Sequence, residues 1–62
     1  MRHNLSPGVV VVIDAFDDVP EHLFRIDEVH EDCVTGTALT GPLAGSYGEP
    51  SFDQIQRVCD PT

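Results

Sequence analysis

The sequence contains no lysine and no tryptophan, and only three basic residues oppose its eleven acidic ones. Binding a phosphate backbone requires Lys and Arg side chains that displace counterions, so direct binding of DNA or RNA is disfavoured, as is an anionic membrane surface. The apolar stretch at residues 9–13 is far too short to span a membrane, and no signal-peptide cleavage site accompanies it. We therefore expect a cytoplasmic protein.

The chain is also short, and it contains only two cysteines. A domain of 62 residues removes only about 60% of its surface from water on folding, so we expect one thin core and no deep substrate cavity. The 40% of hydrophobic residues still indicates a globular chain. Cys33 and Cys59 could close a disulfide loop, but without a secretory signal we expect free thiols.

Residues 9–13 are β-branched throughout, which disfavours a helix and predicts a strand ending near Ala15 or Phe16. Because this run is apolar without alternation, we expect protein on both of its faces. Alternation at Phe24 and Ile26 predicts a second strand over residues 23–29. A helix beginning at Pro20 is the alternative, since proline is favoured at a first helical position.

Val29 falls one place out of this alternation, and we expect a bulge near Glu28 to turn it inward. In the following segment, Gly36 predicts a close approach of a neighbouring backbone or a sharp bend. The remaining elements that we expect are a strand at 33–39, a turn at 41–45, a short strand at 46–48, a single 3₁₀ turn at 51–54 and a last strand at 55–59.

Five short strands with one 3₁₀ turn before the last predict an all-β chain closed into a small barrel, since closure removes exposed strand edges. The apolar spacing at residues 8–13, 23–29, 33–36 and 52–58 resembles the strand layout of SH3-like barrels of the KOW and Tudor kind, including small bacterial proteins of unknown function. The resemblance implies one five-stranded SH3-like barrel over residues 8–59, with a flexible arm at 1–7 and a tail at 60–62.

The binding modes of these families fit the chain poorly. SH3 domains bind Pro-rich peptides in an aromatic-lined groove, and tryptophan is lacking here. A Tudor-type methyl-lysine cage needs several converging aromatic rings, for which Phe16, Tyr47 and Phe52 are the only candidates, and we expect Phe52 to plug the barrel end. KOW-type nucleic-acid binding needs basic loops, and these loops are acidic. The resemblance therefore implies a fold rather than a function.

Eight of the eleven acidic residues fall between positions 14 and 32, where Arg25 is the only base, so this segment carries −7 of the net charge of −8. A basic partner surface suits such a segment, whereas the alternative is that the acids only confer solubility. The two acidic groups flank the second strand, roughly 20 Å apart, and we favour the group at residues 17–21, which faces the turn at 41–45. The candidate partner-binding residues are Asp17, Asp18, Glu21, Glu28, Glu31 and Asp32.

Other chemistry is weakly indicated. His30, Cys33 and Cys59 are too few for a structural zinc site, and the acidic loop from Asp14 lacks the glycine and the bidentate acid of a calcium loop. A nucleophilic Cys33 would need positive neighbours, and its acidic neighbours raise the thiol pKa instead. We expect no metal, no cofactor and no catalytic residue.

Two functions remain. The first is a non-enzymatic protein-interaction module that docks on a basic partner surface. The second is an inhibitor that mimics nucleic acid, such as an anti-CRISPR or other phage-type protein, and occupies the DNA or RNA groove of its partner. Both predict binding that weakens as salt rises. Self-association into a homodimer through a free strand edge is a further arrangement that the sequence allows.

Overall fold

The computed structural model describes residues 5–59, so residues 1–4 of the expected arm and the expected tail at 60–62 lie outside it. Within the described range, no helix is both long and apolar enough to cross a membrane. The elements are β1 (Val10–Ile13), β2 (His22–Val29), β3 (Val34–Ala38), β4 (Tyr47–Gly48), the 3₁₀ helix η1 (Phe52–Gln54) and β5 (Ile55–Cys59).

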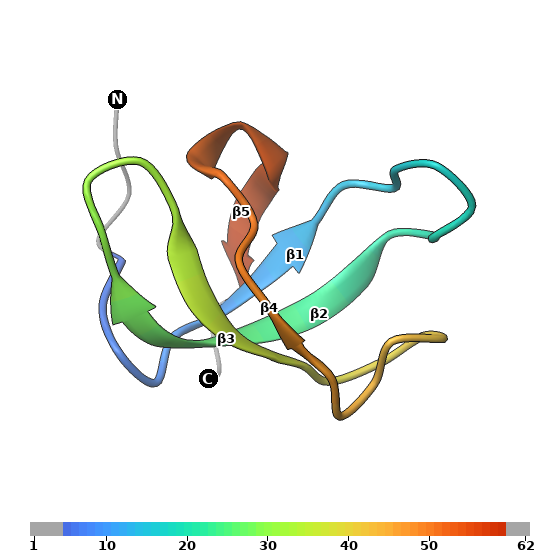
Figure 1. Ribbon diagram of the computed structural model, residues 1–62, viewed down its shortest axis with the longest axis horizontal. Coiled ribbons are helices and arrows are strands. Elements are labelled where there is room, and N and C mark those ends of the chain that lie inside the picture. The colour runs from blue at the N-terminus through green and yellow to red at the C-terminus, as the bar shows by residue number, and fades with distance from the viewer. Residues whose placement is uncertain (1–4, 60–62) are drawn as a thin grey trace.

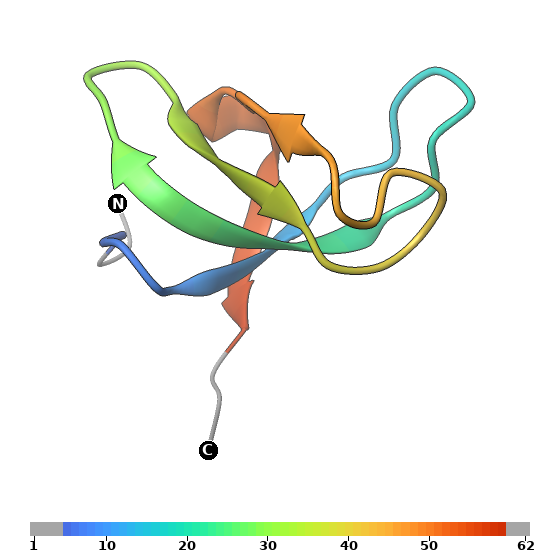
Figure 2. The ribbon, with the colours of Figure 1, turned by 60° about the horizontal axis from the view of Figure 1, so that its bottom comes forward.

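The strands form one antiparallel sheet in the order β4-β3-β2-β1-β5 (Figure 1). The predicted all-β chain with five strands and a 3₁₀ turn before the last is confirmed. Across residues 5–59, β4 and β5 are the two edges of the sheet and no ladder joins them. The sheet is curved, as β2 shows when the molecule is turned (Figure 2), but its hydrogen bonding is open.

β1 is covered on both faces, as its unbroken apolar run predicts. Val11 and Ile13 belong to the core, whereas Val12 does not, although only 4% of it is exposed. Val12 lies between Leu23 and Arg57 in the ladders of β1 with β2 and β5, and these long neighbours flank it on the outer face. The strand ends at Ile13, before the predicted end.

β2 follows the alternation in its sequence, and the alternative helix does not form. The register with β3 shifts between Ile26 and Glu28, which confirms the predicted bulge. The expectation that this bulge turns Val29 inward is wrong, because Val29 is 39% exposed. Val29 is the last residue of β2, beside the turn that leads to β3, so it lies at the margin of the sheet.

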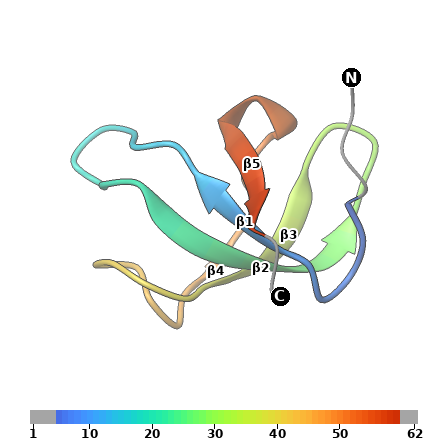
Figure 3. The ribbon, with the colours of Figure 1, turned by 180° about the vertical axis from the view of Figure 1, so that it is seen from behind.

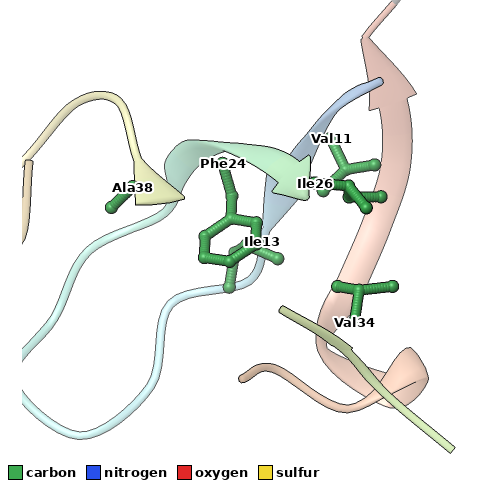
Figure 4. Close-up of a cluster of buried hydrophobic side chains, with 6 residues drawn as sticks. All are labelled: Val11, Ile13, Phe24, Ile26, Val34 and Ala38. Carbon is green, nitrogen blue, oxygen red and sulfur yellow. The ribbon is translucent and has the colours of Figure 1, made fainter. Parts of the chain in front are cut away.

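The core lies on the concave side of the sheet and consists of a few side chains from β1, β2 and β3 (Figure 4). Its buried members are Val11, Ile13, Phe24, Ile26, Val34 and Ala38. Phe52 of η1 and Leu5 are partly buried and pack against this cluster. The side of β3 that carries Val34 and Ala38 faces the core, so Thr35 and Thr37 lie on its other side, where Thr35 is nevertheless only 7% exposed.

Candidate functional site: a groove between two loops

A groove of about 260 Å³ lies at one end of the sheet, where the β1–β2 and β3–β4 loops face each other (Figure 1, right). Its floor is made by core residues, among them Ile13, Phe24 and Ala38, and Phe16 and Leu43 of the two loops line its sides. Sites for drug-sized ligands have volumes of about 300–1,000 Å³. This groove therefore suits one or two side chains of a partner better than a cofactor.

The β1–β2 loop is a tight hairpin. The amide of Phe16 donates to the carbonyl of Val19 at 2.9 Å, and the amide of Val19 donates back at 2.7 Å. Asp17 and Asp18 form the exposed tip between them, and Asp17 has a φ of 49° in the left-handed region. The two carboxylates therefore project from a constrained turn directly beside a groove-lining ring. Glu21 is exposed on the same loop.

His22 supplies a polar atom among the apolar lining. Its Nδ1 lies 2.9 Å from the carbonyl oxygen of Pro20, and its ring centroid is 6.3 Å from that of Phe16. Because a carbonyl can only accept, Nδ1 is the donor in this hydrogen bond. The residue is only 5% exposed, so its ring is held in place.

β4 and the residues after it form the far wall of the groove. Tyr47 is 65% exposed, and its hydroxyl donates to Oε2 of Glu49 at 3.1 Å. Partial burial and then this hydrogen bond raise the pKa of Tyr47, to which the negative charge of Glu28 also contributes. Glu49 was not among the residues that the sequence indicated. Its spacing of two from Tyr47 places both on one side of an extended strand, and this signal could have found it.

The other predicted acids lie at the opposite end of β2. Glu28, Glu31 and Asp32 are all exposed near the β2–β3 turn (Figure 1, upper left), and Oε1 of Glu28 lies 3.4 Å from Nε2 of His30. Figure 3 shows from behind that this turn and the β1–β2 loop are at opposite ends of the molecule. The structure thus separates the six predicted partner-binding residues into two groups of three.

Cys33 lies next to the second group. Partial burial and the carboxylate of Asp32, with a smaller contribution from Glu49, raise the pKa of Cys33, in the direction that its acidic neighbours predict. Cys33 and Cys59 are both free thiols. Among residues 5–59, no group of three or more His, Cys, Asp or Glu side chains is arranged to hold a metal ion.

Neither a protein-family model, nor a curated protein, nor a solved structure matches this chain. The function therefore has to be inferred from the groove and from the charges around it. Of the aromatic residues considered for a methyl-lysine cage, Phe16 and Tyr47 line the groove, and Phe52 packs against the core from η1.

Proposed function

We propose that this chain is a non-enzymatic protein-interaction module, built as a small SH3-like barrel, that docks on a basic surface of a partner protein. The strand order, with η1 before β5, supports the barrel type. The observation that carries the function is the position of the groove: its apolar floor opens beside the loop that presents Asp17 and Asp18. Apolar contact and negative charge are available to a partner at one place.

The charge around the groove has one sign. Of the basic residues that the structure describes, Arg25 is paired with Asp27 at 3.9 Å on β2, and Arg57 lies on β5; neither lines the groove. Acidic groups steer a basic partner towards the site and exclude acidic competitors, while burial of apolar surface supplies affinity. Glu49 in the lining and the acids of the neighbouring β1–β2 loop, beside an apolar floor, are suited to both tasks.

The two acidic ends of the molecule allow a matched test. The double variant Asp17→Asn/Asp18→Asn and the double variant Glu31→Gln/Asp32→Asn remove the same charge from opposite ends. We expect capture of a partner from the native cell extract, read by mass spectrometry, to be lost with the first pair and retained with the second. Capture should also weaken as salt rises. Equal loss with both pairs, or binding that is flat in salt, would contradict docking at the groove end.

Nucleic-acid mimicry is a second candidate, and one observation favours it. The carboxylates of Glu28 and Glu49 both lie close enough to Tyr47 to raise its pKa, and those of Asp32 and Glu49 do the same for Cys33. Glu28 is in register with Thr35 and Tyr47 with Thr37, so Glu28 and Glu49 lie on the same side of the sheet, away from the core. Duplex DNA or RNA added to the captured complex decides the matter, because a mimic would be displaced from its partner by nucleic acid. A complex that nucleic acid leaves intact excludes mimicry at that site.

A further inference from the structure

The ladder between β3 and β4 determines which backbone groups of β4 are already used. The amide of Ala38 donates to the carbonyl of Ser46 at 3.1 Å, and the amide of Val34 donates to the carbonyl of Pro50 at 3.0 Å. Gly48 lies midway between these two acceptors and is also in register with β3. The carbonyls of Ser46 and Pro50 and the backbone groups of Gly48 therefore face β3, while the amide of Ser46 donates to the carbonyl of Leu43 in the preceding turn.

In an antiparallel strand, the N–H and C=O groups of successive residues point to alternate sides. Those of Tyr47 and Glu49 consequently point away from β3, to the edge of the sheet that no strand covers within residues 5–59. No turn, loop or cap hydrogen bond of the described chain uses these groups. Both residues line the groove, so its wall carries unused backbone donors and acceptors.

We propose that an extended segment of a partner protein pairs with this free edge of β4 and adds a strand to the sheet. This inference rests on the proposed function and names the conformation and the residue pattern of the partner. Main-chain hydrogen bonds to an exposed edge provide affinity in such pairing, and alternate side chains provide specificity.

The side chains of β4 define the pattern. A partner residue opposite Gly48 would point to the core face, beside the Phe24 ring in the groove lining: a Cβ on Gly48 would lie 3.4 Å from that ring, which is only 2% exposed. An apolar residue fits there. Partner residues opposite Tyr47 and Glu49 would point to the other face, towards a ring and a carboxylate, where basic residues fit. The expected segment alternates basic, apolar, basic.

The probe is the peptide acetyl-Ala-Arg-Leu-Arg-Ala-amide, titrated into the full chain and followed by ¹⁵N–¹H NMR. We expect the Tyr47 and Glu49 amides to shift and to gain protection from hydrogen exchange. Methylating the backbone nitrogens of both arginines should weaken binding by about tenfold or more, because those amides would pair with β4. Methylating the leucine nitrogen should have little effect, since that amide points away from β4 when the segment pairs antiparallel to it.

A pair of protein variants tests the same hydrogen bonds from the other side. Glu49→Pro and Glu49→Gln both remove the charge, but only the first removes the outward amide. Proline is tolerated on an edge strand where its nitrogen faces away from the ladder. We expect the proline variant to bind the peptide about tenfold more weakly than the glutamine variant. The β3 amide resonances of both variants should stay at their native positions, which would show that the ladder is kept.

The outcomes separate the two proposals. If methylation at arginine and at leucine has the same effect, or if the peptide does not bind, edge pairing is wrong; capture of a partner that depends on Asp17 and Asp18 would still support the proposed function. If the free protein is a dimer by light scattering and the peptide dissociates it, a second copy of this chain occupies the edge, and the basic partner segment is wrong.

Discussion

A Cβ atom placed on Gly36 would lie 1.9 Å from the carbonyl oxygen of Arg25 on the neighbouring strand. Real Cβ atoms essentially never approach a backbone oxygen so closely, so β2 and β3 cross at a distance that only glycine allows. The ring of Phe24 lies 2.9 Å from the same position, so a Cβ there would also clash with this side chain. The predicted close approach at Gly36 is confirmed.

Gly36→Ala should therefore destabilise the protein by about 3 kcal/mol, which lowers the melting temperature of a domain this small by roughly 15 °C. Its control is Gly48→Ala, at the register partner of Gly36 on β4, where a Cβ would make an ordinary contact with Phe24. Thermal unfolding followed by circular dichroism compares the two. Similar melting temperatures of the two variants would contradict this prediction, because they would mean that β2 and β3 move apart to accommodate a methyl group with little loss of stability.

The tip of the β1–β2 loop should respond to substitution at one of its two aspartates only. An L-residue in the left-handed region costs roughly 1 kcal/mol that glycine avoids, and Asp17 occupies this region whereas Asp18 does not. We expect Asp17→Ala to be less stable than Asp17→Gly by about 1 kcal/mol. Asp18→Ala and Asp18→Gly should not show this preference for glycine. Chemical denaturation measures all four, and a preference for glycine at Asp18 alone would contradict the turn.

Adjacent valines of β1 should differ in their tolerance of a hydroxyl group. Val11 is fully buried in the core, so Val11→Thr should cost about 2 kcal/mol for an unpaired hydroxyl. Val12 lines a shallow hollow with Glu21, Thr40 and Arg57, whose polar groups can pair with a hydroxyl. We expect Val12→Thr to cost less than about 1 kcal/mol. The opposite order of stabilities would show that the strand faces are reversed.

Stability should fall in alkaline solution. Partial burial, with nearby carboxylates, raises the pKa values of Cys33 and Tyr47 above their ordinary values of 9.0 and 10.0. The folded chain thus keeps these protons to higher pH than the unfolded chain, so the stabilisation is present below the ordinary values and is lost as pH rises through the raised ones.

The chain has no lysine, so few other side chains titrate in this range. Melting temperatures of the native chain and of Cys33→Ser/Tyr47→Phe, measured from about pH 8 to about pH 11, test the assignment. The double variant should show a clearly smaller alkaline decrease. An equal decrease of melting temperature in both proteins would show that groups other than Cys33 and Tyr47 cause the alkaline loss of stability.

The strands were predictable because their signals are local. The β-branched residues of β1, the alternation at Phe24 and Ile26, and the segment before Ile55 each indicate structure through near neighbours alone. The exposure of Val29 was predicted wrongly because alternation counts positions along one strand. It does not report where neighbouring elements end.

The candidate site was predictable only in part. Asp17, Asp18 and Glu21 were singled out from charge, and the structure places them on the loop beside the groove. The groove itself, with Leu43 and His22 in its lining, combines residues from separate parts of the chain. Periodicity and composition give no signal for such a combination.

By itself, the amino-acid sequence determined the all-β class, the order of five strands and one 3₁₀ turn along the chain, and the strong negative charge. Only the tertiary structure decided which strands are neighbours, and hence that the backbone groups of Tyr47 and Glu49 are left on a free edge inside a groove. The physical reason is that strand propensity and charge belong to local sequence, whereas register and edge exposure depend on pairing between distant segments, which the packing of the whole core selects.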